Sequence, residues 1–343
     1  MQQWTTAADR ALHALTTAFW DEKERFFQPV LPVDPAHNPC YWWQAHAIDA
    51  LLDGYLRTGD PALLELAWKD LEGTVAKNNG TILNNWYDDM EWMALALLRL
   101  YDSTNDEAAL KRVRILWKDI QSAWNDHCGG GMAWRKNQLD YKNTPANAPA
   151  AILALRLYRR FGDEADLAWG CKIYEWNRDY LMNPETYYVY DGMNREGDGK
   201  IDMDWRFTYN QGVMIGAAVE LYQITGEQEY LNVACGIARQ VRDTFLNENG
   251  VFPYEGKDDC GLFRGILMRY LVELARVAPE DVREMIRGML EQNATMLAEN
   301  GLRADGLIGG EWTSAPAEGQ AVDLAQHLSG LMLLEMTLQA QKE

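Results

Sequence analysis

The sequence predicts an all-α protein with an (α/α)6 toroid fold, a ring of six helical hairpins. Apolar residues recur at helical spacing along nearly the whole chain, and strand-like alternation is nearly absent. One sequence pattern also recurs four times. A tyrosine ends an apolar helix, a short turn follows that ends in Gly or Asn and then Asp or Glu, and a new amphipathic helix begins. Those turn residues are the expected stop and start signals of helices. The four copies begin at Tyr55, Tyr101, Tyr158 and Tyr222.

The first helix of each hairpin is amphipathic, as expected for the outer layer of a ring. We predict these outer helices at residues 2–20, 60–78, 106–125, 163–180, 227–246 and 280–299. The second helix of each hairpin is apolar on more of its sides, which predicts an inner, buried layer. We predict these inner helices at residues 42–57, 86–101, 144–161, 208–225, 260–277 and 318–339. The sequence shows no linker between two halves, so we expect one domain over residues 1–343.

The two kinds of connection differ in length and composition. The turns from inner to outer helices span about four residues each. The connections from outer to inner helices are longer and rich in Gly, Asp, Asn and aromatic residues, at 21–41, 79–85, 126–143, 181–207, 247–259 and 300–317. In a ring of hairpins all the long connections emerge on one face, where they can build a site.

Composition narrows the function. The formal net charge of −19 argues against nucleic acid or an anionic membrane surface as a partner. The five cysteines show no metal-ligand spacing and suit a reducing compartment, and the N-terminal residues carry no signal-peptide pattern, so we expect a cytoplasmic location. No cofactor and no metal are expected, and the oligomeric state stays open. The 14 Trp and 16 Tyr suit sugars, whose ring faces are apolar and whose edges carry hydroxyls.

Asp88 and Asp89 are the first candidate for chemistry, because they stand in the first turn of a predicted inner helix at the loop face. Glycoside hydrolysis needs one carboxylic acid to protonate the leaving oxygen and one carboxylate as nucleophile or base. Two nearby carboxyls push their pKa values apart, which separates these roles. Two acids can also simply stabilise a helix N-terminus, and neighbouring residues on a helix point about 100° apart.

The stretch NWYDDMEWMALALLRLYD, residues 85–102, resembles the tandem-aspartate signature of the glycoside hydrolase family 76 α-1,6-mannanases. Four further motifs resemble the same family in the same order. They are Trp42-Trp43-Gln44 before AHAIDALLDGYLRTGD, the glycines 129–131 through Trp134 with KNTPANAPAAILALRLY, DGM at Asp191 with TYNQGVMIGAAVELY, and LFRGILMRYL at Leu262. The resemblance implies an (α/α)6 fold and retaining, endo-type cleavage of α-1,6-linked mannan, with Asp88 as nucleophile and Asp89 as general acid/base.

Loop placement and the resemblance together also indicate substrate contacts. We expect Trp42, Trp43, Trp86 and Trp134 to be sugar platforms. Further expected contacts are Gln44, Tyr87, Asn143, Asn147, Asp191, Tyr209, Asn210, Gln211 and Asp259. Three features depart from the family pattern: Glu91 where members commonly have a small residue, Arg264 in place of a lysine, and the lack of an export signal. A cytoplasmic member would handle imported α-mannoside oligosaccharides rather than intact mannan.

Two other functions stay open at this stage. Epimerases of N-acyl sugars use histidines as acid and base on a similar scaffold, and His46 and His327 both fall on predicted inner helices. An aromatic-lined ring could also bind glycans without cleaving them. Residues 194–205 imitate a Ca²⁺-binding loop but carry Trp205 where the bidentate Glu belongs, so we interpret them as a glycine-rich rim loop. The second aspartate pair, Asp258-Asp259, either contacts substrate or caps a helix.

Overall fold

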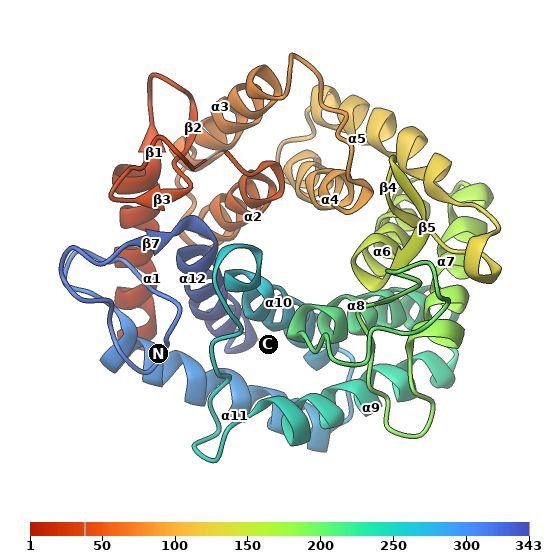
Figure 1. Ribbon diagram of the computed structural model, residues 1–343. Helices are drawn as coiled ribbons and strands as arrows, with labels where there is room; N and C mark the ends of the chain where they lie inside the picture. The colour runs from red at the N-terminus through yellow and green to blue at the C-terminus, as the bar shows by residue number, and fades with distance from the viewer. Residues whose placement is uncertain (38, 343) are drawn as a thin grey trace. The chain divides into compact units, whose positions relative to one another are not determined.

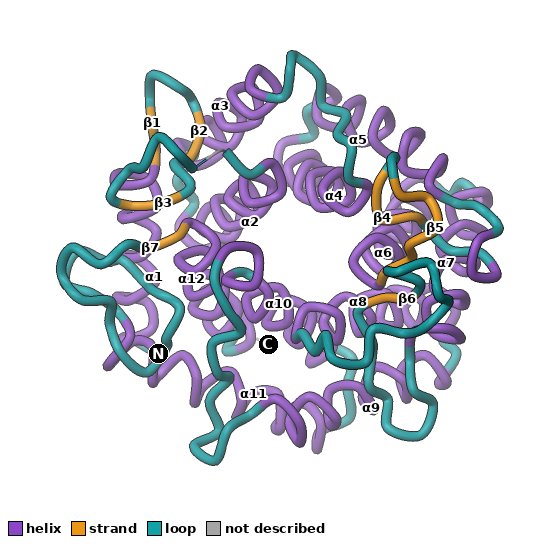
Figure 2. The backbone as a smooth tube through the Cα atoms, viewed as in Figure 1, coloured by secondary structure: helices purple, strands orange, loops and turns teal. Residues whose placement is uncertain are grey.

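The computed structural model describes residues 1–37 and 39–342. Helices dominate it, and the few strands are short (Figures 1 and 2). Within the described residues the α-helices are α1 (Gln2–Ala14), α2 (Tyr41–Thr58), α3 (Ala62–Lys77), α4 (Tyr87–Thr104), α5 (Glu107–Ile120), α6 (Thr144–Phe161), α7 (Glu164–Leu181), α8 (Thr208–Thr225), α9 (Gln228–Phe245), α10 (Phe263–Ala275), α11 (Glu280–Met296) and α12 (Leu324–Ala340). None of these helices is long and apolar enough to cross a membrane.

The strands form three small antiparallel sheets in the long connections, which the sequence pattern did not predict. They are β1 (Trp20–Asp21) with β2 (Phe26–Phe27), β3 (Val30–Leu31) with β7 (Val322–Asp323), and β4 (Ala133–Arg135) with β5 (Gln138–Asn143) and β6 (Gly192–Met193). At two to six residues these strands are too short for alternation to reveal them. Two of the pairings, β3 with β7 and β5 with β6, also join segments far apart in the chain.

The chain divides into two compact units, which are described separately. Unit 1 comprises residues 1–81, 245–272 and 284–343, and unit 2 comprises residues 82–244 and 273–283. In unit 2, α4 packs against α5 and α6, and α6 packs against α7 and α8. In unit 1, α2 packs against α3 and α12, and α12 packs against α1.

The predicted division into buried and covering helices is present within each unit. All residues of α6 from Thr144 to Leu157 are buried, as are those of α8 from Thr208 to Leu221. By contrast, α5 buries one face through residues such as Val113, Leu116 and Ile120 and exposes the other. A helix buried on all sides must be apolar all round, whereas a covering helix needs only one apolar stripe.

The repeated tyrosine phrase has one structural role in all four copies. After each tyrosine the helix continues for three residues and ends at a residue in the left-handed conformation, with φ between 54° and 75°. That residue donates its backbone N–H to the tyrosine carbonyl, in the pairs Gly59–Tyr55, Asn105–Tyr101, Gly162–Tyr158 and Gly226–Tyr222. This is the expected left-handed helix cap, so the predicted stop signal is confirmed.

Some predicted boundaries were wrong. Four of the turns from inner to outer helices are shorter than the four residues expected, at 59–61, 105–106, 162–163 and 226–227, whereas the turn at 276–279 has four. The last inner helix begins at Leu324 rather than at residue 318, because Asp323 and Gln326 form a capping box at its start. The helix expected at 260–277 spans Phe263–Ala275, and a 3-10 turn at Asp258–Gly261 precedes it.

Candidate active site

Asp88 and Asp89 lie in the first turn of α4, and both are half-buried. One Asp88 oxygen accepts the indole N–H of Trp134 at 2.9 Å, and the other accepts the backbone N–H of Asp89 at 3.0 Å. Asp89 instead accepts the side-chain amide of Asn84 at 2.8 Å. The two carboxyls therefore have different hydrogen-bond donors. A donor stabilises the charged form of the carboxyl that it contacts, and unequal stabilisation allows one carboxyl to act as nucleophile and the other as acid.

Trp134 reaches Asp88 from β4. Its ring packs edge-on against Tyr141 of β5, with centroids 5.8 Å apart and planes at 87°, and the Arg135 guanidinium covers it at 4.5 Å. The glycines before β4 let this strand approach α7: a Cβ on Gly131, whose φ is +83°, would lie 2.7 Å from the Trp176 ring. The glycine triplet thus places the tryptophan that contacts the aspartate pair.

Asp191, which lies in the long connection between α7 and α8, is the centre of a hydrogen-bond cluster. One of its oxygens accepts the Tyr209 hydroxyl at 3.1 Å and the Asn210 amide at 3.0 Å. The other accepts the Tyr141 hydroxyl at 3.2 Å and an Arg195 N–H at 3.0 Å. Burial raises the pKa of Asp191, and the Asn210 amide and the Arg195 charge oppose that rise.

Tyr209 links this cluster to the aspartate pair. Burial raises its pKa well above the ordinary value, and the charge of Asp191 and then that of Asp88 add to the rise. Tyr209 therefore lies within electrostatic range of Asp88 while its hydroxyl is bonded to Asp191. The structure thus brings together Asp88, Trp134, Asp191, Tyr209 and Asn210, all of which the sequence singled out.

Two amide oxygens in this region are buried without a hydrogen-bond partner among the described residues. They belong to Asn143, which precedes α6, and to Asn210, whose amide nitrogen is bonded to Asp191. A buried carbonyl oxygen without a donor costs free energy in the empty protein, and a ligand hydroxyl can supply the missing donor. Both residues are candidates for such a contact.

Three other predicted contacts hold the protein's own loops. Gln44, Asn147 and Gln211 are each the fourth residue of a buried helix, and each side-chain amide pairs with both the N–H and the C=O of one loop residue. We call this arrangement an amide clamp. The pairs are Gln44 with Phe27 (3.0 and 3.0 Å), Asn147 with Met132 (2.7 and 3.1 Å) and Gln211 with Val189 (3.0 and 2.7 Å). Substrate contact by these three residues stays a prediction.

Trp86 and Tyr87 stand at the start of α4 and differ in exposure. Trp86 is 38% exposed, and its role as a sugar platform stays a prediction. Tyr87 is buried, and its hydroxyl lies 3.3 Å from the hydroxyl of Ser122. The structure thus leaves Trp86 available as a platform and uses Tyr87 in packing.

Trp42, Trp43 and Asp259 form a separate cluster in unit 1. Both indole N–H groups donate to the same Asp259 oxygen, at 2.9 and 3.0 Å. Burial raises the pKa of Asp259, and the two indoles oppose the rise. Trp42 also packs edge-on against His46 and at a tilt against Phe263. Because both tryptophans are more than nine-tenths buried, the structure shows them as the support of Asp259, and their role as sugar platforms stays a prediction.

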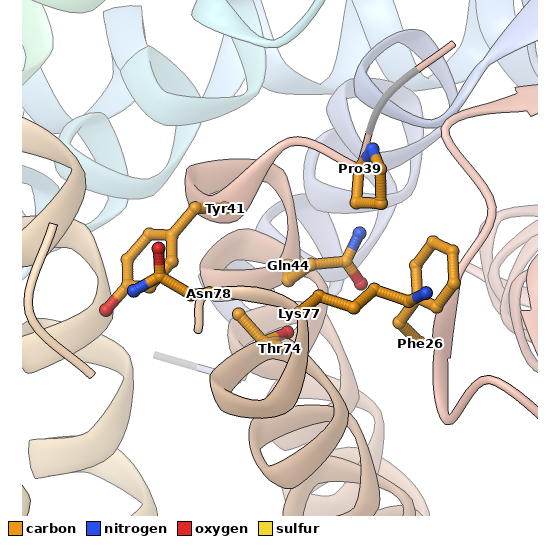
Figure 3. A pocket seen from close by; sticks show the side chains of 7 residues that line it. All are labelled: Phe26, Pro39, Tyr41, Gln44, Thr74, Lys77 and Asn78. Atoms are coloured by element: carbon orange, nitrogen blue, oxygen red, sulfur yellow. The ribbon is translucent and has the colours of Figure 1, made fainter. Parts of the chain in front are cut away.

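A cavity of about 380 Å³ opens beside Gln44 in unit 1 (Figure 3). Tyr41 and Asn78 lie at one end of it, and Phe26 with Lys77 lies at the other (Figure 3). The Lys77 ammonium is 4.2 Å from the Phe26 ring centroid and 2.8 Å from Glu24. None of the described residues that line this cavity is a carboxylate, so it cannot supply the two acids of glycoside hydrolysis.

Glu91 is a third carboxyl in the same helix as the aspartate pair, and it is fully buried. Neither of its oxygens has a hydrogen-bond partner among the described residues. Burial raises its pKa well above the ordinary value, and the charges of Asp88 and Asp89 raise it further against a small opposing influence of the Ala150 amide. Burial and the two neighbouring charges therefore favour the uncharged form of Glu91. The sequence showed that Glu91 departs from the family pattern, but it did not predict that this side chain is buried.

The two histidines of the epimerase alternative are buried in unit 1. Burial lowers the pKa of His46 to about 3 and that of His327 to about 4. His327 is the fourth residue of α12, and its ring contacts the N–H of Ile308 and the carbonyl of Ala11. A histidine held neutral in this way is poorly suited to exchange protons with a substrate.

Side chains of the rim loop at residues 194–205 form hydrogen bonds and an ion pair within the loop. Asn194 accepts the N–H of Gly199 and donates to the Asp140 carbonyl, and Asp198 pairs with Lys200. Across the described part of the chain, no group of three or more His, Cys, Asp or Glu side chains is placed to hold a metal ion.

Comparisons with known proteins identify the family. The model of the family "Glycosyl hydrolase family 76" matches residues 3–343. Mannan endo-1,6-alpha-mannosidase DCW1 of Candida glabrata is 27% identical over 297 residues, which are 77% of this chain and 64% of that protein. The DCW1 protein of Saccharomyces cerevisiae is 26% identical over 298 residues, again 77% of this chain and 64% of that protein. The chain thus spans less than two thirds of the length of these curated relatives.

Solved structures match over almost the whole chain. The GH76A alpha-1,6-mannanase from Salegentibacter sp. HEL1_6 is 39% identical, with a TM-score of 0.93 over 98% of this chain and 99% of that one. A variant of that protein described as inactive, with two adjacent aspartates changed to asparagine, is solved with alpha-1,6-mannotriose at the same TM-score and 38% identity, covering 98% of this chain and 99% of that one. The solved members of this family are (α/α)6 toroids, which confirms the predicted fold class. The chain belongs to glycoside hydrolase family 76.

Proposed function

We propose that this protein hydrolyses α-1,6-linked mannosides with retention, using Asp88 as nucleophile and Asp89 as general acid/base. The observation that carries the proposal is the pair itself: two adjacent carboxyls at a helix start, one bonded to an indole and the other to an amide. The Salegentibacter enzyme named an alpha-1,6-mannanase is described as inactive when two adjacent aspartates are replaced.

The hydrogen bonds support this division of roles. An indole N–H and a backbone N–H both favour the ionised form of Asp88, which a nucleophile requires. In a retaining reaction Asp89 would first protonate the leaving oxygen and then activate the water that releases the sugar from Asp88. The buried amide oxygens of Asn143 and Asn210 would accept hydrogen bonds from sugar hydroxyls.

The test uses α-1,6-mannotetraose and proton NMR of the first product. We expect the wild-type protein to release an α-anomer first, and Asp88→Asn and Asp89→Asn each to lower the rate by at least about 10²-fold. The chain offers a matched control in its other adjacent pair: Asp258→Asn should stay within a few-fold of wild type.

Three results would contradict the proposal. A β-anomer as the first product would show inversion, and a loss in Asp258→Asn equal to that in Asp88→Asn would place the chemistry elsewhere. An intact substrate that nevertheless binds in a calorimetric titration would show a glycan-binding protein instead of a hydrolase.

A further inference from the structure

Arg195, in the rim loop at residues 194–205, reaches into the Asp191 cluster. Its guanidinium donates to Asp191 at 3.0 Å and to Asp202 at 3.1 Å, and it also donates to the Tyr141 hydroxyl. The single hydroxyl proton of Tyr141 lies within reach of both carboxylates, since its oxygen is 3.2 Å from Asp191 and 3.0 Å from Asp202. One cation thus joins two carboxylates and a phenol within unit 2.

Two aromatic rings also contact the Arg195 guanidinium. Its central carbon lies 3.7 Å from the Trp205 ring centroid and 4.5 Å from that of Tyr141. Contact with aromatic rings and donation to two carboxylates at once suit the planar, permanently charged guanidinium better than an ammonium group. The Arg195 side chain is only 22% exposed, so its ion pairs are shielded from solvent more than a surface pair is.

This geometry gives the acidic and amide residues of the Ca²⁺-like loop sequence other partners than a metal ion. Asp202 would be a ligand of such an ion, but it is bonded to Arg195 and Tyr141. Asn194 is bonded within the loop and to β5. The positive charge that the carboxylates need comes from the arginine of the same loop.

The charge of Arg195 matters most to Asp191, which is 4% exposed at its side chain. The groups that face Asp191 are Tyr141 from β5, Tyr209 and Asn210 from α8, and Arg195 and Asp202 from the loop. Among these, Arg195 is the only cation; the nearby Lys142 directs its ammonium to the Gly131 carbonyl. Without Arg195 a buried carboxyl beside Asp202 would favour its protonated form. A protonated Asp191 has fewer acceptor sites for its three other donors.

We propose that Arg195 is a positioning residue of the active site: it keeps Asp191 ionised, so that Asp191 holds the Tyr209 hydroxyl and the Asn210 amide in place. These two residues connect the loop to the reaction, because Tyr209 lies in range of the Asp88 charge and Asn210 presents a free amide oxygen. The inference rests on the proposed function of the Asp88–Asp89 pair.

The first experiment compares Arg195→Met and Arg195→Lys with wild type on α-1,6-mannotetraose from pH 5 to pH 8. Arg195→Met should lower kcat by about 10- to 100-fold at pH 5, since small displacements of positioning groups have effects of that size. The loss should shrink toward pH 8, where Asp191 regains its charge without help. Arg195→Lys restores a charge, so its loss should be smaller and should vary little with pH.

Two further variants separate positioning from general loss of stability. Arg160→Met removes another arginine–carboxylate pair of unit 2, that with Asp102, and should leave kcat within a few-fold of wild type. Asp191→Asn is permanently uncharged, so the fold by which it lowers kcat should not vary with pH. The double variant Asp191→Asn with Arg195→Met should lower kcat by a smaller factor than the product of the factors measured for the two single variants. Arg195→Met with full kcat, or with the same loss at every pH, would overturn the proposal.

A measurement that does not need activity keeps this inference apart from the proposed function. In Arg195→Met the folded-state pKa of Asp191 is raised further above its unfolded value. This variant therefore loses stability relative to wild type as pH rises through that pKa. The difference in unfolding free energy between wild type and Arg195→Met should therefore grow from pH 4 to pH 7 in urea titrations. If wild type cleaves no mannoside and this difference still grows, the substrate proposal fails and the Arg195–Asp191 link stands. A difference in unfolding free energy that stays constant with pH would contradict the link between Arg195 and Asp191.

Discussion

The indole nitrogen of Trp134 and a carboxylate oxygen of Asp88 are 2.9 Å apart, in a direct hydrogen bond from a loop strand to a helix start. A bond from a neutral donor to a charged acceptor is worth about 1.5–3 kcal/mol. If Asp88 is the nucleophile, this bond fixes both its orientation and its charge. The tryptophan then contributes to the reaction through its nitrogen as well as through its ring.

Trp134→Phe keeps a ring beside Tyr141 but removes the donor. We expect kcat on α-1,6-mannotetraose to fall about 10- to 100-fold, which corresponds to the free energy of one such bond. Trp117→Phe is the matched control, since it removes another indole–carboxylate bond of unit 2, the 2.7 Å bond to Asp166. The control should lose stability but keep kcat. Equal kcat in wild type and Trp134→Phe would show that Asp88 does not depend on the indole.

Glu91→Gln tests the buried third carboxyl through stability. Glu91 has a raised pKa in the folded protein, so its favourable contribution is complete below the unfolded pKa and is lost as pH rises through the folded pKa. Relative to wild type, Glu91→Gln should gain up to about 1.4 kcal/mol of stability per pH unit above pH 4.5, until the folded pKa is reached. Urea titrations at pH 4, 6 and 8 measure this difference. A difference that does not change with pH would mean that Glu91 ionises in the folded protein as it does in water.

Gln211→Leu tests the amide clamp. The substitution leaves the N–H and the C=O of Val189 buried without partners, so we expect a loss of about 2–4 kcal/mol in the free energy of unfolding. Gln228→Ala removes an exposed amide contact to Asn232 and should change stability by no more than about 0.5 kcal/mol. A Gln211→Leu protein as stable as this control would mean that solvent replaces the clamp.

Gly131→Ala tests the approach of β4 to α7. The alanine Cβ would lie 2.7 Å from the Trp176 ring at a φ of +83°, so both strain and a steric clash are expected. Gly197→Ala has a similar φ of +73° with no atom near the added Cβ, and it should cost only about 1 kcal/mol. We expect Gly131→Ala to lose more than twice as much stability in thermal unfolding, and also to lose kcat because Trp134 is displaced. Equal stability losses in the two variants would rule out the clash.

Much of the fold was predictable because its signals are local. The capping of α2, α4, α6 and α8 needs only a tyrosine, a residue that tolerates the left-handed conformation and an acid, and these stand next to one another in the sequence. The aspartate pair was predictable for the same reason, since two adjacent residues at a helix start are visible without a structure. The single-domain organisation and the cytoplasmic location stay predictions.

The parts of the site that could not be predicted depend on backbone groups and on distant segments. An amide in a helix start looks the same in the sequence whether it binds a sugar or a loop, and the Gln211 clamp to Val189 is visible only in three dimensions. The rim loop shows the same difficulty: its pattern of Asp and Asn imitates a Ca²⁺ site, but Arg195 supplies the charge. Sequence patterns show which donors and acceptors exist, and the fold decides how they pair.

The amide clamps have a consequence for how such a protein can change. Each clamp binds the main chain of one loop residue, and the three residues held this way, Phe27, Met132 and Val189, share only a buried, apolar side chain. A connection can therefore be exchanged for one of different sequence and length, provided that it brings one extended peptide group to the helix start. The clamp thus constrains one peptide group of each connection and leaves the rest of that connection free to vary.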